Sequence, residues 1–249
     1  MSEDIAIRVR GLVTRFGDQT VHDGLDLDVR RGEIMGVVGP SGTGKSVLLR
    51  EIVGLDPPTD GEITFPYHEG EGREPRLGVM FQDGALFSNL TVLENVEAPL
   101  REHTQLSAHL RSEIAGLKLS MAGLGPDAHF KRPAQISGGM RKRAAVARAL
   151  ALDPELLFLD EPTAGLDPIS AENFDRMTEE LARSLGLTVF LVTHDLDTLH
   201  AICDRVAVLY QGKVAAIGTI PEITANAEGW VKEYFSGPRG RAAERATGG

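Results

Sequence analysis

Hydrophobic residues recur along this chain with the two periods expected of a protein that mixes strands and helices. Residues 25–29 alternate apolar and acidic side chains, which is typical of a β-strand with one buried face. Residues 35–38 are almost continuously apolar, as in a parallel strand covered on both faces. The same criteria predict strands at Ile5–Val13, Leu25–Val29, Ile34–Val38, Glu62–Phe65, Leu77–Phe81, Leu156–Leu159, Thr188–Val192, Val206–Tyr210 and Lys213–Ile217.

Between about residues 88 and 152 the strand pattern stops and the chain becomes almost wholly helical. Helix starts are marked by the capping-box spacing of Thr91-Val92-Leu93-Glu94 and by Asp167 before Pro168. We therefore expect one α/β domain over residues 1–235, with an inserted all-α subdomain at approximately 88–152. Residues 236–249 have little that could pack, which predicts a flexible C-terminal tail. The polar stretch 65–77 contains Pro and Gly and predicts a short loop.

The composition is that of a folded domain and excludes several classes of protein. Of 249 residues, 42% are hydrophobic and 25% are charged, which excludes a disordered chain. The net charge of −10 argues against nucleic-acid binding, and the single cysteine, Cys203, cannot form an intramolecular disulfide. The acidic start Met1-Ser2-Glu3-Asp4 is unlike a signal peptide, and no apolar run reaches the ~20 residues of a membrane span. These features predict a protein that stays in the cytoplasm unless a partner holds it at a membrane.

A glycine-rich phosphate-binding motif follows one of the most apolar predicted strands. The pattern G-x-x-x-x-G-K-S/T is met by Gly39-Pro40-Ser41-Gly42-Thr43-Gly44-Lys45-Ser46, directly before an apolar helix. Glycines let successive backbone N–H groups face a polyphosphate at a helix N-terminus. Lys45 is then expected to reach the β- and γ-phosphates, and the Ser46 hydroxyl to ligate Mg²⁺. The plainer alternative is a glycine-rich turn with an exposed lysine, and the flanking strand and helix argue against it.

A second strand ends in two carboxylates. Leu156–Leu159 is apolar and leads into Asp160 and Glu161. Beside a phosphate loop, Asp160 is expected to join the magnesium shell and Glu161 to orient the attacking water. Taken alone, this run is equally compatible with a solvated strand end.

One further motif gives the chain a family resemblance. Ile136-Ser137-Gly138-Gly139-Met140, followed by Arg141-Lys142-Arg143-Ala144, resembles the signature motif of ABC-transporter ATPases. The resemblance covers about residues 5–218 and implies a P-loop NTPase core with an antiparallel β portion and an inserted all-α subdomain. It further implies that Phe16 stacks on adenine, that Gln82 is the Q-loop glutamine, that Ala164-Gly165-Leu166-Asp167 is the D-loop and that His194 is the switch histidine.

The motifs and the resemblance together give a candidate ATP site. Glu161, His194 and Lys45 are the expected catalytic residues, and Ser46, Gln82 and Asp160 the expected metal ligands. The cofactors implied are ATP and Mg²⁺. The expected nucleotide-binding residues are Phe16, Gly39, Pro40, Ser41, Gly42, Thr43, Gly44, Lys45, Ser46, Val47, Gln82, Ser137, Gly138, Gly139, Asp167 and His194.

Several of these residues also have plainer interpretations. Ser137 could simply cap a helix, Phe16 could be an ordinary aromatic at a strand end, and a lone histidine such as His194 is often structural. Asp167 can cap a helix and contact a second subunit at the same time. The basic run Arg141–Arg143 is expected to form a solvated face of the signature helix rather than a nucleic-acid patch.

The resemblance also implies partners that one chain cannot contain. In ABC ATPases the signature motif of one subunit closes over the P-loop nucleotide of another, which predicts a head-to-tail homodimer with two ATP molecules in its interface. The spanning part of such a transporter belongs to an integral membrane permease. This places the chain at the cytoplasmic face of the bacterial inner membrane. No nucleic acid is expected as a partner.

Local sequence narrows the subfamily. Residues 79–87 and 99–104, together with Met140, resemble the ATPases of Mla/Mce-type lipid transporters. This resemblance implies phospholipid transport between bacterial membranes and a periplasmic lipid-binding (Mce-type) partner. Leu86, Phe87 and Leu90 are expected near the groove that receives a permease helix.

Other functions stay open on the sequence alone. The same motor could drive another cargo, such as an amino acid or a drug, since every ATP-site residue would be shared. A soluble ABC ATPase acting on DNA or ribosomes is disfavoured by the acidic balance and by the lack of a basic insertion. A nucleotide sensor that binds without hydrolysis is disfavoured by Glu161.

Overall fold

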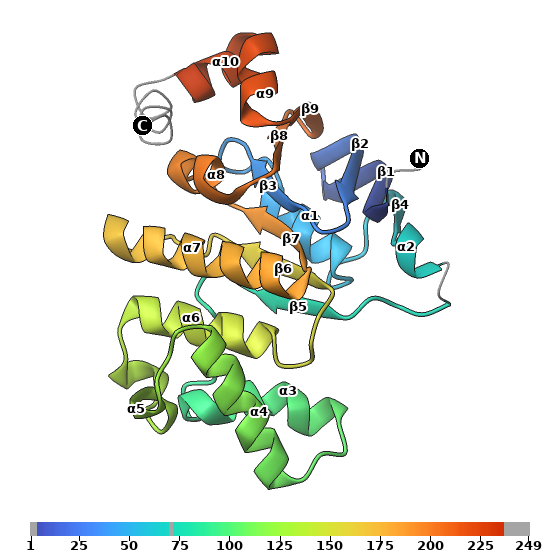
Figure 1. Ribbon diagram of the computed structural model, residues 1–249. Coiled ribbons are helices and arrows are strands. Elements are labelled where there is room, and N and C mark those ends of the chain that lie inside the picture. Colours follow the sequence, from blue (N-terminus) through green and yellow to red (C-terminus); the bar gives the residue numbers. More distant parts are fainter. Residues whose placement is uncertain (1–3, 70–71, 237–249) are drawn as a thin grey trace. The chain divides into compact units, whose positions relative to one another are not determined.

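The computed structural model describes residues 4–69 and 72–236 (Figure 1). The chain divides into two compact units, the first formed by Met1–Pro75 with Thr188–Gly249 and the second by Arg76–Leu187. The expected tail 236–249 lies outside the described residues except for Ser236, which ends a helix. Within the described part of the chain, no helix combines the length and apolar character that crossing a bilayer requires.

A three-stranded antiparallel sheet in the first unit contains the N-terminal strands. Its order is β2 (Gln19–Arg30), β1 (Ile5–Phe16) and β4 (Asp60–Thr64). The predicted alternation along β2 is confirmed, with apolar side chains buried and acidic ones toward solvent. Both β1 and β2 extend beyond the predicted bounds, because Gly17 adopts a φ of 58° in a tight turn between them.

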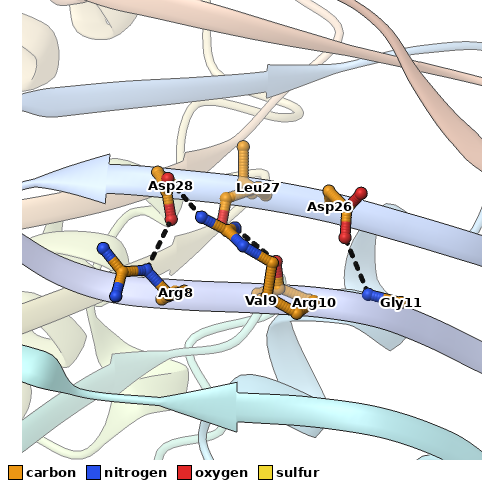
Figure 2. A network of polar contacts seen from close by, with 7 residues as sticks. All are labelled: Arg8, Val9, Arg10, Gly11, Asp26, Leu27 and Asp28. Atoms are coloured by element: carbon orange, nitrogen blue, oxygen red, sulfur yellow. Dashed lines mark hydrogen bonds and ion pairs between the residues drawn. The ribbon is translucent and has the colours of Figure 1, made fainter.

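Charged side chains join β1 to β2 on their solvent side (Figure 2). Arg10 Nη2 donates to Asp28 Oδ2 at 2.6 Å, and Arg8 Nε donates to Asp28 Oδ1 at 3.4 Å. The N–H of Gly11 donates to Asp26 Oδ1 at 2.7 Å. The hydrogen bond with Asp28 and that residue's negative charge raise the pKa of the Arg10 guanidinium above its ordinary value. Because these pairs are solvent-exposed, they specify strand register more than they stabilise the fold.

The first unit also contains buried parallel strands. The order there is β7 (Thr188–Val192), β3 (Ile34–Val38), β8 (Arg205–Tyr210) and β9 (Lys213–Gly218). β3 pairs in parallel with both β7 and β8, while β9 pairs antiparallel to β8. Every residue of β3 and β7 is buried, as the continuous apolar runs predict. Helices α1 (Lys45–Ile52) and α8 (Leu196–Ile202) follow β3 and β7 in the sequence.

The last two described helices belong to the core of the first unit. α9 (Ile220–Asn226) and α10 (Gly229–Ser236) bury Ile223 and Phe235 in one cluster with residues of β3, β8 and α8. Trp230 stacks on Tyr210 with ring centroids 5.4 Å apart. The α/β part of the chain therefore stays ordered up to the start of the expected tail.

The expectation of a plain loop at 65–77 is wrong in part. Pro66–Glu69 forms the short helix α2, which begins at a proline. The guanidinium of Arg31 lies 4.1 Å from the centre of the Tyr67 ring, a cation–π contact that holds the turn. The sequence around Tyr67 shows no partner for its ring, because Arg31 lies in the turn after β2, far earlier in the chain.

The second unit combines two strands with the predicted helical block. β5 (Leu77–Met80) pairs in parallel with β6 (Leu156–Asp160). The capping box at Thr91 is present, and Ser107, Ser137 and Asp167 also cap helices. Whether residues 88–152 act as a separate subdomain stays a prediction. The helices are α3 (Val92–His103), α4 (Ala108–Met121), α5 (Pro126–His129), η1 (Pro133–Gln135), α6 (Gly138–Ala149) and α7 (Pro168–Leu185).

Candidate functional site

The glycine-rich loop of the first unit connects β3 to α1. Gly42 and Gly44 adopt φ values of 82° and 88°, which a residue with a side chain seldom takes. Gly44 is the N-cap of α1 and, as a glycine, has no side chain that could cap the start of that helix. The N–H groups at a helix start that follows a glycine turn fit a phosphate group.

Lys45 folds back over this loop. Its Nζ donates to the backbone oxygens of Gly39 at 2.8 Å and Pro40 at 3.0 Å. Thr43 Oγ1 also donates to Pro40, at 2.9 Å. The ammonium group is therefore held against the loop backbone, where a polyphosphate lying along the loop could reach it.

Gly39 is required for the close approach of the loop to β8. A Cβ at Gly39 would lie 2.2 Å from the backbone oxygen of Leu209. We expect Gly39→Ala to lower the free energy of unfolding by more than about 2 kcal/mol, because the clash is with backbone. Gly42→Ala is the matched control: among the described residues its Cβ meets nothing within 4 Å, and its positive φ costs about 1 kcal/mol. Denaturant unfolding compares the two, and equal losses would contradict the close approach.

His194 leaves the same edge of the parallel strands as the loop. In the pairing of β3 with β7, Val37 lies opposite Val192, and the N–H of Thr193 donates to the Val37 oxygen at 3.2 Å. The carboxyl ends of both strands therefore reach one edge, where ligands of α/β sheets usually bind. The His194 side chain is exposed, and its backbone oxygen accepts a hydrogen bond from Tyr234 Oη of α10 at 3.1 Å.

Phe16 ends β1 and is 55% exposed, so its ring is available for stacking. The first unit thus contains Phe16, residues 39–47 and His194 among the expected site residues. The second unit contains Gln82, Ser137–Gly139, Asp160, Glu161 and Asp167.

In the second unit, two adjacent strand ends carry the expected metal and water ligands. Met80 lies opposite Leu159 in the parallel pair β5–β6, so Gln82 and the Asp160-Glu161 pair follow neighbouring strands. Asp160 is buried. Glu161 has a φ of 48°, a left-handed conformation that is strained for a residue with a side chain. Backbone strain of this kind persists where surrounding bonds hold it, and it is concentrated at functional sites.

Lys142 supplies one of the bonds that hold this region. Its Nζ donates to the backbone oxygens of Gln82 at 3.1 Å and Glu161 at 3.2 Å, and so links the ends of β5 and β6. Burial lowers the pKa of the Lys142 ammonium from its ordinary value, although the negative charges of Asp83 and Glu161 oppose the shift. Lys142 therefore links the backbone of the expected Q-loop glutamine to the backbone of the expected catalytic glutamate.

The expectation that Arg141–Arg143 form a solvated face is wrong. Lys142 is buried, and Arg141 Nη1 donates to the Ile136 oxygen at 2.9 Å. Arg143 Nη1 donates to the Ala122 oxygen at 3.0 Å, and burial lowers the pKa of its guanidinium. A signal was present in the sequence: the next turns of α6 are built of Ala and Val on nearly all sides, which indicates a helix buried all round.

The signature residues begin α6. The Ser137 hydroxyl accepts a hydrogen bond from the N–H of Met140 at 3.2 Å, so its helix-capping role is confirmed. Asp167 caps α7 in the same way, and hydrogen bonds from Ser170 lower the pKa of its carboxyl. Some residues of the expected Q-loop, signature and D-loop line one hollow of about 490 Å³, whereas Ser137, Gly139 and Asp167 are not part of its lining. The hollow is lined by Gln82, Asp83, Gly138, Arg141, Lys142, Ala164, Gly165 and Leu166.

The residues present suit magnesium bound with a phosphate rather than a protein cage. In the described ranges 4–69 and 72–236, no three His, Cys, Asp or Glu side chains group as a metal site. Mg²⁺ in nucleotide sites is typically held by one or two carboxylates together with phosphate oxygens and water. The buried carboxylate of Asp160 and the hydroxyl of Ser46 are donors of that kind.

Comparison with known proteins agrees with these motifs. The family model described as ABC transporter matches residues 22–164. The chain is 39% identical over 250 residues to the intermembrane phospholipid transport system ATP-binding protein MlaF of Escherichia coli K12, covering 95% of this chain and 91% of that protein. It is 36% identical over 247 residues to the probable ribonucleotide transport ATP-binding protein mkl of Mycobacterium leprae, covering 96% and 71%.

Solved structures are similar as well. The dimeric ATP-binding cassette MJ0796 in a post-hydrolysis state with ADP and Pi superposes with a TM-score of 0.77 at 31% identity, covering 86% of this chain and 98% of that one. Clostridium perfringens cbiO1, part of the transporter complex cbiONQ, gives 0.79 at 28% identity, covering 98% and 99%. The expected fold class, a P-loop ABC ATPase core, is confirmed.

Nucleotide binding and ATP hydrolysis are properties of the family to which these matches point, and ATPase dimers that work with a membrane permease are general in it. The chain belongs to the ABC transporter family and is an ATP-hydrolysing ATP-binding cassette.

Proposed function

We propose that this chain is the motor subunit of a transporter that moves phospholipid between bacterial membranes. The observation that carries the proposal is its 38% identity over 239 residues to MlaF of Haemophilus influenzae, covering 93% of this chain and 90% of that protein. That protein's name describes intermembrane phospholipid transport. An ATPase of such a system works at the cytoplasmic face of the inner membrane, with an integral permease and a periplasmic lipid-binding protein of Mce type.

The site residues divide the work of ATP hydrolysis between the two units. In the first unit, the N–H groups of the loop and Lys45 bind the phosphates, Phe16 stacks on adenine, and His194 bonds the γ-phosphate. Ser46 in the first unit is a candidate ligand of Mg²⁺, and so are Asp160 and Gln82 in the second; the ion would offset charge on the transferring phosphoryl group. Glu161 orients the water that attacks it.

A second copy of the chain completes each ATP site. The chain has one glycine-rich loop and one signature sequence, and Ser137, Gly138 and Gly139 present N–H groups at the start of α6. The N–H groups of one copy bind the γ-phosphate held by the loop of the other. The dimeric arrangement of the similar cassette MJ0796 supports this.

The permease docks on the exposed apolar turn after Gln82. Phe87 is 53% exposed, and the buried side chain of Asn95 on α3 holds the Phe87 backbone. The Phe87 N–H donates to Asn95 Oδ1 at 2.7 Å, and Asn95 Nδ2 donates to the Phe87 backbone oxygen at 3.1 Å. Arg148 donates to the oxygens of Gly84 and Ala85, and its guanidinium lies 6.0 Å from the Phe87 ring. An apolar ring fixed in an exposed position costs little entropy on binding, which suits a docking site.

Charge at Phe87 is expected to release the permease. Phe87→Glu should lower co-purification from the source membranes by at least about tenfold, because a buried unpaired carboxylate is costly in an interface. Leu185→Glu is the control, a charge placed at a residue of α7 that is 44% exposed. Mass spectrometry of the wild-type complex should identify a permease, an Mce-type protein and phospholipid. Equal recovery of the permease with both variants would rule out this docking site.

A second cargo class has one observation in its favour. The mkl protein of Mycobacterium tuberculosis, 35% identical over 243 residues, is named for ribonucleotide transport. The same purification distinguishes the two. Recovery with a permease for a water-soluble solute, and without a lipid-binding protein, would overturn the phospholipid proposal and leave the ATPase in place.

A further inference from the structure

Three buried polar side chains lie beneath the glycine-rich loop and have no part in the roles described above. Thr14 of β1 and His22 of β2 are direct partners across the antiparallel pair, and Glu51 comes from α1. The side chains of His22 and Glu51 are both 0% exposed. Thr14 Oγ1 lies 2.7 Å from Glu51 Oε1 and 2.8 Å from His22 Nδ1, while Nδ1 lies 3.3 Å from Glu51 Oε2.

One hydrogen atom of the His22 ring can be assigned from its acceptor. His22 Nε2 lies 3.2 Å from the backbone oxygen of Gly44, which can only accept, so Nε2 carries a hydrogen. The Thr14 hydroxyl lies between Glu51 Oε1 and His22 Nδ1 and hydrogen-bonds with both. The ring of His22 is therefore held at both nitrogens, by Thr14 on one side and by the Gly44 oxygen on the other. A buried polar cluster is costly to break on one side only, because the remaining partners are left without their hydrogen bonds.

The cluster ends on the peptide group that starts α1. The Gly44 oxygen accepts the helical N–H of Leu48 at 2.8 Å as well as the His22 ring, so two donors fix it. A Cβ at Gly44 would lie 2.5 Å from His22 Nε2, which shows how closely the ring approaches the loop. Because a peptide group is planar, holding this oxygen also fixes the direction of the Lys45 N–H on its other side.

We propose that Thr14, His22 and Glu51 position the glycine-rich loop for nucleotide. His22 holds the Gly44 carbonyl, and Thr14 and Glu51 hold His22 in the orientation that does so. The loop is thereby kept ready for phosphate before ATP arrives, which lowers the cost of ordering it on binding. His22 is a positioning residue in this account, which rests on the proposed role of residues 39–46 in binding ATP.

Two amide substitutions at position 22 distinguish the role of Nε2 from that of Nδ1. A glutamine at position 22 can place its amide nitrogen near Nε2 and keep the bond to Gly44, whereas an asparagine places it near Nδ1 and loses that bond. We expect His22→Asn to raise the Kd for Mg-ATP about tenfold and the KM alike, with kcat changed less than about twofold. His22→Gln should stay within about threefold of the wild-type Kd. Both variants lose part of the buried hydrogen bonding of the cluster, so both should unfold at lower denaturant concentration.

The Kd values for Mg-ATP of the wild type and the two variants are measured by ATP titration of the folded proteins at the same temperature. A purely structural role predicts the same loss of stability in the two variants with unchanged Kd, and that result would overturn the proposal. Equal Kd increases in both variants would also overturn it, since the bond to Gly44 would then not matter.

A second pair decides the matter if the His22 variants do not fold. Thr14→Val keeps the shape of the side chain but removes the hydroxyl between Glu51 and His22, and Thr14→Ser restores it. We expect Thr14→Val to weaken ATP binding about threefold and Thr14→Ser to bind as wild type; identical binding by the two contradicts the proposal. Lys45→Ala serves as the reference: if it binds ATP normally, the proposed site itself fails, whereas its loss of binding beside unchanged Thr14 or His22 variants rejects the positioning role alone.

Discussion

Replacing Glu161 by glutamine is expected to lower ATP turnover by about two to three orders of magnitude while ATP stays bound. The glutamine side chain has the same size as that of Glu161. It leaves in place the strained backbone of residue 161, whose backbone oxygen accepts a hydrogen bond from Lys142 Nζ at 3.2 Å. It cannot orient and activate water as a carboxylate does. Loss of kcat with an almost unchanged Kd is the signature of a group that acts in the chemical step.

Phosphate release at saturating Mg-ATP measures this effect. Glu180→Gln is the matched control, because it removes the same charge from an exposed position on α7 of the same unit. That control should hydrolyse ATP at the wild-type rate. Turnover of Glu161→Gln within about threefold of wild type would remove Glu161 from the catalytic step and favour a different water-orienting group.

Replacing Lys45 by alanine is expected to weaken ATP binding by about a hundredfold. The Lys45 ammonium already lies on the oxygens of Gly39 and Pro40, at 2.8 and 3.0 Å, so it needs little movement to reach a phosphate in the loop. Charge-assisted hydrogen bonds to phosphate contribute about 1.5–3 kcal/mol each, which corresponds to roughly tenfold to a hundredfold or more in Kd.

Titration with a fluorescent ATP analogue tests this prediction. The control is Arg50→Ala on the same helix, where Arg50 Nε pairs with Asp56 at 2.6 Å on the exposed side. We expect the control to bind ATP as wild type does. Wild-type affinity in Lys45→Ala would mean that the loop does not carry the nucleotide.

Much of the fold and of the candidate site could be predicted from the sequence because its signals are local. The apolar run of β3 and the glycine pattern after it lie next to one another in the chain, and so do β6 and its two carboxylates. Helix caps such as Thr91 and Asp167 are equally local, since the capping side chain bonds an N–H three residues on. Each of these features needs only neighbouring residues to be recognised.

What could not be predicted depends on partners far apart in the sequence. From the sequence alone, Lys142 is expected at the surface. In the structure it donates to the backbone oxygens of Gln82 and Glu161, which lie 60 and 19 residues away in the chain. Thr14 and Glu51 are 37 residues apart, and their contact with His22 follows from how α1 packs on the hairpin. Whether a polar side chain can be buried depends on hydrogen-bond partners that the fold brings to it. Hydropathy patterns carry no information about those partners.

This chain is an ATPase, and we infer that its nucleotide site is completed by a second copy. Native mass spectrometry of the Glu161→Gln variant with Mg-ATP tests it most directly, because the mass reports protein copies and nucleotides together. The expected result is two chains with two ATP molecules, and separate chains once nucleotide is removed. Single chains that each hold one ATP at saturating nucleotide, with and without the permease, would contradict it.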